Sequence, residues 1–222
     1  MEKLSKIKEL ASQPLSNDKD IRRVEIIMLK FKESPEIIDK AITKIIHNTN
    51  HPFKLTIFDN RPNNANTSRI WNKLIKESTC DYVMLIDSDA YVPKCEPCWL
   101  TRMMEMIDET GIVIPVSSCG GGQNQHVSKA EDYPSTEINK GIWSGYCFLF
   151  KKELYEKVGE FDERFYIYGQ DSEWAYRVGK LGGAVMRKDT LVEHIGSASF
   201  SSNPDREDDK LYARELFKFL TK

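Results

Sequence analysis

The most constraining stretch of the sequence is DYVMLIDSDAY at residues 81–91, where an apolar run ends in two carboxylates one residue apart. The run Val83 to Ile86 is typical of a strand that is buried on both faces of a parallel sheet. Asp87 and Asp89 follow at its carboxyl end, where open α/β sheets bind ligands. Two carboxylates that point the same way are costly unless a cation or a proton neutralises them. The pattern is consistent with a metal site, or with a plain turn, because Asp and Ser both favour turns.

Length and composition are those of a globular protein with one domain. The chain has 222 residues, of which 40% are hydrophobic and 30% are charged, and its net charge is −2. This charge gives no overall attraction to nucleic acid or to an anionic membrane. No apolar stretch approaches the roughly 20 residues of a membrane span, and the N-terminus lacks the apolar core of a signal peptide. We therefore expect a cytoplasmic protein.

The cysteines indicate reduced thiols. Their number, five, is odd in a chain without an export signal, and they occupy positions 80, 95, 98, 119 and 147. Cys95 and Cys98 form a C-x-x-C pair, but no second pair follows to complete a zinc tetrahedron. We interpret this pair as structural.

Strand and helix patterns alternate along most of the chain. The expected strands are 24–29, 53–58, 83–86, 112–115, 141–150 and the strand end 191–194. The expected helices begin at Pro35, in the stretch 63–78, at Pro97, after Phe150, at Asp171 and near the C-terminus. This order predicts an α/β fold with a mostly parallel central sheet flanked by helices. Residues 1–21 read as an appended helix and linker ahead of this domain.

Phosphate-binding glycine motifs are missing from this pattern. Neither G-x-G-x-x-G nor G-x-x-x-x-G-K-[ST] occurs. A phosphate group would therefore have to be held in another way, and a metal on the Asp pair is the first candidate. Two further residues stand at suggestive places: Asp171 at a helix start, where a plain N-cap is the simpler interpretation, and His194 at a strand end, as the Asp pair is.

Three segments together resemble family-2 glycosyltransferases of the GT-A fold, most closely a bacterial rhamnosyltransferase-like group. They are VMLIDSDA, GIWSGYCFLFKKELYEKVGEFDERFYIYGQDSEWAYRVGKLG and VEHIGSAS, and the resemblance covers about residues 22–200. It implies a Rossmann-like nucleotide-binding domain over 22–222. Within it, 22–118 would bind the nucleotide sugar, 119–200 would carry the acceptor and catalytic half, and 201–222 would form a lid and a C-terminal helix. The implied reaction moves a sugar from a nucleotide-diphosphate sugar, a UDP-sugar, to a hydroxyl of a glycan or glycoconjugate with inversion.

The resemblance also implies catalytic and metal-binding roles. Asp89 matches a direct metal ligand, Asp87 a contact to ribose or metal-bound water, and His194 a further metal ligand. Asp171 matches the carboxylate that removes a proton from the acceptor hydroxyl. Carboxylate oxygens suit Mg²⁺ or Mn²⁺, and an imidazole favours Mn²⁺.

Binding roles follow in the same way. Asp59 matches the residue that reads the base, and other expected nucleotide contacts are Lys30, Asn60, Arg69, Asp87 and Ser88. The expected acceptor contacts are Trp143, Ser144, Gly145 and Gln170. Two departures stand out: Gln170 replaces the usual Glu, and the first strand ends in LKFK instead of Pro-Thr-polar-Asn. The stretch from Asp59 to Asn72 is also shorter than in many family members, because it lacks the extra strand often found there. If this loop contacts the base, the preferred donor nucleotide differs from theirs.

The expected partners are a nucleotide-sugar donor and a glycan acceptor, with no stable nucleic-acid partner and with peripheral membrane contact left open. Residues 196–210, rich in Ser, Asn and Asp, are expected to close as a lid. Two alternatives compete. A sugar-1-phosphate nucleotidyltransferase would need a Gly-rich loop with Arg near the first strand, and VEIIMLKFKES has none. A non-catalytic module that binds a glycan or nucleotide sugar would be favoured by loss of Asp171 or of the Asp pair, and both are present.

Overall fold

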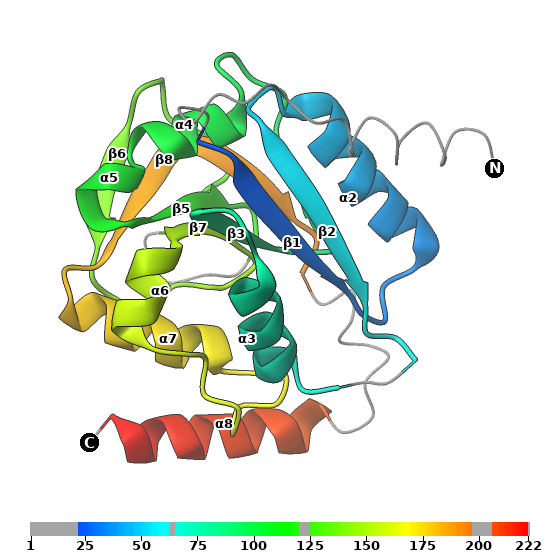
Figure 1. The fold of residues 1–222 in the computed structure, drawn as a ribbon, viewed down its shortest axis with the longest axis vertical. Coiled ribbons are helices and arrows are strands. Elements are labelled where there is room, and N and C mark those ends of the chain that lie inside the picture. Colours follow the sequence, from blue (N-terminus) through cyan, green and yellow to red (C-terminus); the bar gives the residue numbers. More distant parts are fainter. Residues whose placement is uncertain (1–21, 63–64, 120–124, 197–205, 222) are drawn as a thin grey trace.

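The computed structural model describes residues 22–62, 65–119, 125–196 and 206–221. They form three layers, with a central sheet between two sets of helices (Figure 1). The predicted N-terminal helix and linker, and most of the predicted lid, lie outside these residues.

The central sheet has the predicted mostly parallel character. Its order is β2-β1-β3-β7-β5-β8-β4, and β6 pairs with β8. β1 lies parallel between β2 and β3, and β5 is parallel to β8, whereas β7, β4 and β6 are antiparallel to their neighbours. The strands are β1 (Val24–Lys30), β2 (Phe53–Asp59), β3 (Tyr82–Asp87), β4 (Ala90–Tyr91), β5 (Ile112–Ser117), β6 (Thr136–Asn139), β7 (Cys147–Lys151) and β8 (Ala184–His194).

Helices cover both faces of the sheet, which explains the continuous apolar runs in its strands. The helices are α2 (Pro35–Asn48), α3 (Thr67–Glu77), α4 (Trp99–Glu105), α5 (Ile107–Thr110), α6 (Lys152–Val158), α7 (Gln170–Lys180) and α8 (Arg206–Leu220). Side chains of α2, α4 and α5 form one core with Ile26 and Met28, and side chains of α3, α6 and α7 form the other with Ile27. Successive residues of β1 thus point to opposite faces, and both faces are buried.

Some predicted elements differ from the observed ones. The predicted helix 97–110 is divided into α4 and α5 at Met106, and the predicted strand 141–150 contributes only β7, from Cys147. The strand end expected at 191–194 belongs to the longer β8. β4 and β6 were not predicted, because two-residue and mostly exposed four-residue strands carry no periodic apolar signal.

Buried polar residues at the start of α3 hold the loop that precedes α7. Asn66 Nδ2 donates to the carbonyl of residue 163 at 2.8 Å, and Ser68 Oγ donates to that of residue 165 at 2.8 Å. One turn further along, Asn72 Nδ2 donates to the carbonyl of residue 161 at 2.9 Å. The backbone of the loop 161–169 is therefore fixed by the helix beside it.

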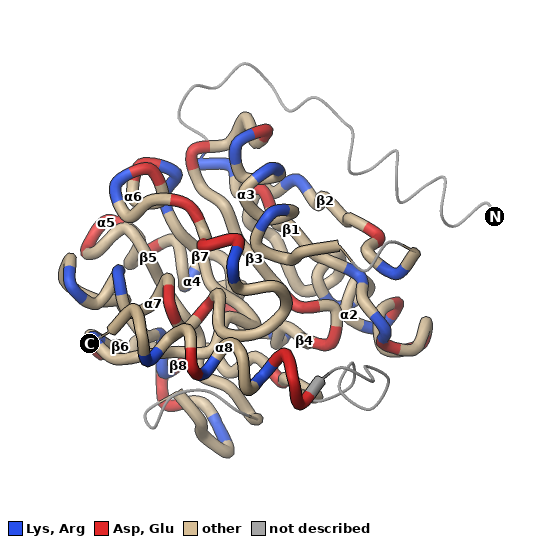
Figure 2. The backbone as a smooth tube through the Cα atoms, turned by 90° about the horizontal axis from the view of Figure 1, so that it is seen from below, with Lys and Arg blue, Asp and Glu red and all other residues tan. Residues whose placement is uncertain are grey.

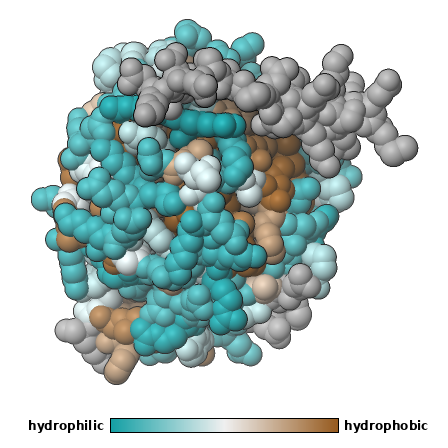
Figure 3. Space-filling model, in the orientation of Figure 1, coloured by the Kyte–Doolittle hydropathy of each residue, from teal (hydrophilic) through white to brown (hydrophobic). Residues whose placement is uncertain are grey.

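The surface is mixed in charge and mostly polar. Lys and Arg are interspersed with Asp and Glu along the backbone drawn in Figure 2. Apolar side chains gather over β1 and β2 in Figure 3. Among the described residues, no helix is long and apolar enough to span a bilayer.

A buried ion pair in β8 makes a stability prediction. Arg187 Nη2 lies 2.7 Å from Asp189 Oδ2, and both side chains are fully buried. Replacing one partner leaves the other as a buried charge without a counterion. Arg187→Met should therefore lower the free energy of unfolding, measured by urea denaturation, by about 3–5 kcal/mol. The double variant Arg187→Met/Asp189→Leu should recover most of this loss. The exposed pair of Lys218 and Glu215 supplies the control, since Lys218→Met should change stability by no more than about 0.5 kcal/mol. A loss below about 1 kcal/mol for Arg187→Met would contradict the prediction.

Candidate active site

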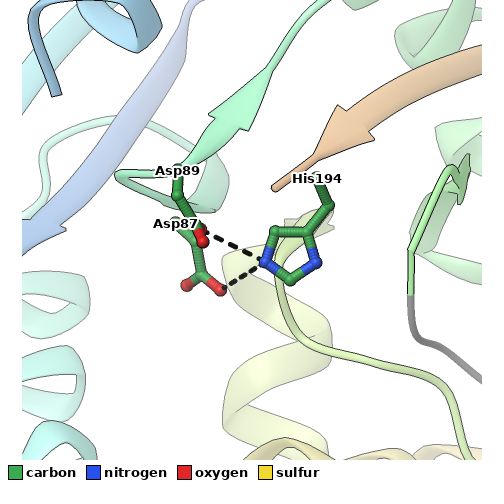
Figure 4. A group of neighbouring side chains, drawn as sticks. All are labelled: Asp87, Asp89 and His194. Atoms are coloured by element: carbon green, nitrogen blue, oxygen red, sulfur yellow. Dashed lines mark ion pairs between the residues drawn. The ribbon is translucent and has the colours of Figure 1, made fainter. Parts of the chain in front are cut away.

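The predicted Asp-Ser-Asp stretch and the strand-ending histidine come together at one edge of the sheet (Figure 4). Asp87 ends β3, Asp89 lies in the turn into β4, and His194 ends β8. Antiparallel pairing of β4 with β8 places His194 opposite Ala90. His194 Nε2 lies 3.2 Å from Asp89 Oδ1 and 3.7 Å from Asp87 Oδ2. One ligand atom from each of the three residues lies within 4.8 Å of the others, close enough to share a cation.

The electrostatics of this trio favour a cation. Burial, together with the charge of Asp89, raises the pKa of Asp87 to about 8. Burial alone would lower the pKa of His194, but its hydrogen bond to Asp89 and the charges of Asp87 and Asp89 raise it. The raised pKa of Asp87 means that ionising both carboxylates together is unfavourable without further positive charge, even with His194 beside them. A divalent cation would supply the missing positive charge.

Neighbouring groups orient the imidazole of His194 for metal binding. Its Nδ1 lies 3.3 Å from the carbonyl oxygen of Cys119, and its ring stacks on Tyr146 with centroids 4.9 Å apart. A carbonyl oxygen only accepts hydrogen bonds, so the neutral imidazole carries its proton on Nδ1. The hydrogen bond from Nε2 to Asp89 requires a second proton on the ring, and a cation bound between Nε2 and the carboxylates would replace that proton. Such an outer partner is typical of metal-binding histidines, and the donor set of two carboxylates and one imidazole fits Mn²⁺ or Mg²⁺.

Asp171 lies on the first turn of α7 and is held by two backbone N–H groups. Gly169, with φ of 83°, is the N-cap residue, so the N-cap interpretation of Asp171 was wrong. Asp171 Oδ2 accepts the N–H of Gly145 at 2.8 Å, and Oδ1 accepts the N–H of Ser172 at 2.8 Å. Burial raises the pKa of Asp171, and these hydrogen bonds oppose the rise. Oδ1 also accepts the Ser172 hydroxyl at 3.4 Å, whereas Oδ2 keeps a lone pair for a further hydrogen bond.

One cleft of about 230 Å³ is lined by Asp171 and by Asp87, Asp89 and His194, which we call the metal trio for the cation that they could hold. Predicted residues that also line this cleft are Asn60, Ser88, Ser144, Gly145 and Gln170. The side-chain amide of Asn60 makes both of its hydrogen bonds to the backbone of Ala65, which shapes the loop after β2. The structure thus brings together residues from 60 to 194 that the sequence analysis had assigned to one site.

Four predicted binding residues are absent from the lining of the cleft. Asp59 and Lys30 end the paired strands β2 and β1, and Asp59 pairs with Arg61, which lowers its pKa to about 2. Arg69 is an exposed side chain 2.9 Å from Glu163. Trp143 packs in the aromatic core, with its ring centroid 4.9 Å from that of Phe148. Their assigned contacts to nucleotide or acceptor remain predictions from the resemblance.

Several residues that line the cleft were not predicted. They are Leu29, Phe31, Glu33, Thr67, Trp71, Tyr146, Ile167, Tyr168 and Gly169. Glu33 is the only one with a carboxylate, and it is buried. Its polar surroundings in the sequence, KFKES, read as an ordinary loop, so no local signal marked it.

The close approach of Gly145 to Asp171 leads to a second prediction. A Cβ at position 145 would lie 2.5 Å from the Cβ of Asp171, nearer than real contacts allow. Gly145→Ala should therefore displace Asp171. If Asp171 is the catalytic carboxylate that the resemblance implies, kcat should fall by roughly 100-fold, since misplacing a catalytic group by about 1 Å costs that much. Nucleotide affinity, measured by calorimetry, should stay within about threefold. Gly141→Ala is the control, because the nearest atom to its added Cβ is 3.4 Å away. Equal kcat values for the two variants would refute the prediction.

Comparison with known proteins agrees with this geometry. A sequence model of Glycosyl transferase family 2 matches residues 32–172, more than half of the chain. No curated protein sequence matches. Among solved structures, the crystal structure of GalNAc-T7 with UDP, GalNAc and Mn²⁺ is similar, with a TM-score of 0.61 at 12% identity. The match covers 80% of this chain and 44% of that one, so this chain corresponds to less than half of its neighbour. The likeness confirms the predicted GT-A fold, and the family match shows that the chain belongs to glycosyl transferase family 2.

Proposed function

We propose that this glycosyltransferase is metal-dependent and inverting, and that it moves a sugar from a UDP-sugar to a hydroxyl group of a glycan or glycoconjugate. The observation that carries the proposal is the joint presence of the metal trio and Asp171 in one cleft. The solved neighbour, whose structure contains UDP and Mn²⁺, supports this choice of donor and metal.

Asp87, Asp89 and His194 are the residues that would hold the cation. When bound, the cation would stabilise the negative charge that develops on the leaving nucleoside diphosphate. The imidazole favours Mn²⁺ over Mg²⁺. His194 keeps its orientation through Cys119 and Tyr146, so the trio needs little rearrangement on binding.

Asp171 acts as the general base in this proposal. Its carboxylate is fixed by Gly145 and Ser172, and its Oδ2 has a lone pair left to accept the proton of an acceptor hydroxyl. A deprotonated hydroxyl that attacks opposite the leaving group inverts the anomeric carbon. Ser144 and Gln170 line the cleft beside Asp171 and are proposed to contact the acceptor. A cytoplasmic location remains a prediction from the sequence.

A thermal-shift panel tests the proposal. UDP, GDP, CMP and several UDP-sugars are each added with Mn²⁺ and with a chelator. A ligand at about 100 times its dissociation constant adds about 2.7 kcal/mol, which should raise the midpoint by roughly 5–10 °C for a chain of this size. We expect UDP and one UDP-sugar to shift the midpoint only when Mn²⁺ is present. A shift that survives the chelator would refute metal dependence, and no shift with any nucleotide would refute the donor assignment.

A further inference from the structure

The C-terminal helix α8 has no part in the roles assigned above. The family match ends at residue 172, so α8 lies outside it. Ala213 is the one residue of α8 whose described side chain is buried, with 6% of its surface exposed. The residue beside it, Tyr212, is 56% exposed. The methyl group of Ala213 is therefore covered by another part of the chain.

α8 lies along the N-terminal half of α7 (Figure 1). Lys210 Nζ is 5.7 Å from the ring centroid of Tyr168, which directly precedes the N-cap of α7. The ring of Phe217 meets that of Tyr176, within α7, edge-on at 6.0 Å between centroids. Lys210, Ala213 and Phe217 are spaced i, i+3, i+7, which places them on one face of α8. Ala213 thus lies between the two outer contacts.

Between these contacts α8 meets Gly169, the N-cap residue of α7. A Cβ built on Gly169 would lie 3.2 Å from the Cβ of Ala213 and 3.0 Å from Cδ1 of Phe165. Both distances are shorter than ordinary van der Waals contact, and the ring of Phe165 is fully buried. Gly169 is therefore enclosed between the Ala213 methyl group and the Phe165 ring, with no space for an added carbon.

The start of α7 depends on this packing because it has no capping side chain. An Asp or Ser at the N-cap would fix the first turn by a hydrogen bond, and Gly169 has no side chain to do so. Its backbone, at φ of 83°, is also the least restricted of any residue type. Its carbonyl accepts the N–H of Glu173 at 2.9 Å, which begins the helix. Gln170 and Asp171 follow directly, and both line the cleft.

We propose that Ala213 is a positioning residue, which holds the first turn of α7 through Gly169 and so keeps Asp171 in place for proton transfer. The inference rests on the proposed function and extends it to a helix beyond the family match. A larger side chain at position 213 would displace Gly169 and Asp171, and a shift of about 1 Å in a catalytic group costs about 100-fold in rate. The N–H of Gly145 would also lose its hydrogen bond to Asp171.

The test compares Ala213→Leu with Ala213→Ser, and with Arg214→Leu, which places the same Leu at the adjacent exposed position. The first measurement is the rate of UDP release, with Mn²⁺ and with water as acceptor, from the UDP-sugar that the thermal-shift panel selects. This rate is divided by the fraction of chains that bind UDP. The second measurement is hydrogen exchange of the Gly145 amide, followed by NMR.

Ala213→Leu should lower kcat by about 10- to 100-fold and leave the affinity for UDP with Mn²⁺ within about threefold. The Gly145 amide should exchange about 10-fold faster, because its hydrogen bond to Asp171 is lost. Ala213→Ser adds one atom and should keep most of the rate, and Arg214→Leu should match the wild type in both measurements. Ala213→Val adds a smaller group and repeats the test if Ala213→Leu does not fold.

Two results would overturn the inference and leave the proposed function intact. One is an unchanged rate with unchanged Gly145 exchange in Ala213→Leu and Ala213→Val. The other is faster exchange throughout the chain at an unchanged rate per UDP-binding chain, which would mean that α8 contributes only stability. Undiminished UDP release by Asp171→Asn would instead overturn the proposed base, while the Gly145 exchange would still report whether Ala213 positions that side chain.

Discussion

Asp171→Asn should abolish detectable sugar transfer while leaving metal-dependent nucleotide binding within about threefold of the wild type. An amide cannot take the acceptor proton, and loss of a general base typically costs about 10²–10⁴ in rate. The loss should appear in kcat, measured by release of the nucleoside diphosphate in the presence of an acceptor. The side-chain amide would also face the N–H of Gly145 or Ser172, so a loss of about 1–3 kcal/mol in stability is expected.

Stability must therefore be separated from chemistry in this experiment. Glu173→Gln is the matched control, because Glu173 lies on the same helix and pairs with Arg177 at 2.6 Å outside the cleft lining. It should lose stability and keep its kcat. Substantial transfer by Asp171→Asn would remove Asp171 as the base.

The pH dependence of the wild-type enzyme offers a further check on the same residue. If Asp171 is the proposed base, activity requires its ionised form, and the rate falls as the pH drops through its pKa. Because burial raises that pKa, the acidic fall of kcat/KM should lie at a higher pH than an ordinary aspartate would give.

Asp89→Ala should eliminate metal-dependent nucleotide binding. Asp89 is 4% exposed and contacts His194 directly, so its loss removes one proposed ligand and an interaction that orients another. Replacing a residue that only hydrogen-bonds to a metal ligand typically lowers metal affinity by about 10- to 100-fold. Loss of a ligand itself should cost more, so we expect the affinity for UDP with Mn²⁺ to fall by about 100-fold or more. Titration calorimetry with Mn²⁺ alone and with Mn²⁺ plus UDP measures both effects.

The control for this variant is Asp39→Ala, which removes an exposed carboxylate from α2. It should leave both affinities unchanged. If Asp89→Ala retained Mn²⁺-dependent UDP binding at the wild-type level, the trio would not be the metal site. The thermal shift of UDP with Mn²⁺ should disappear in the same variant, which links this result to the ligand panel.

Much of the fold and the centre of the site follow from local patterns in the sequence. The run Val83 to Ile86 predicts β3 because a short run that is apolar at every position is typical of a strand covered on both faces. The parallel pairing of β1 with β2 follows from the helix between them. Asp87 and His194 end strands and Asp89 lies in the turn directly after Asp87, so the three meet where the ends of β3 and β8 lie at one edge of the sheet.

The remaining features depend on geometry that no local pattern contains. Asp59 and Asn60 differ by one position, and that step decides which of the two lines the cleft. Glu33 is held at the cleft by a hydrogen bond from Ser88, which lies 55 residues further along the sequence. The bulge in the pairing of β5 with β8, between Pro115 and Val116, likewise depends on two distant segments.

The attachment of the loop 161–169 to α3 bears on how acceptor preference can be re-engineered. Asn66, Ser68 and Asn72 hold the backbone of this loop, through hydrogen bonds to the carbonyl groups of residues 163, 165 and 161 and from the N–H of Phe161. Tyr168, which lines the cleft, is therefore a position to vary in a combinatorial library, whereas the buried Phe161 and Phe165 should be kept. The three gripping residues should be kept constant in such a library, although none of them is expected to touch the acceptor. Selection would then act on the side chains that line the cleft, while the backbone of the loop 161–169 stays in place.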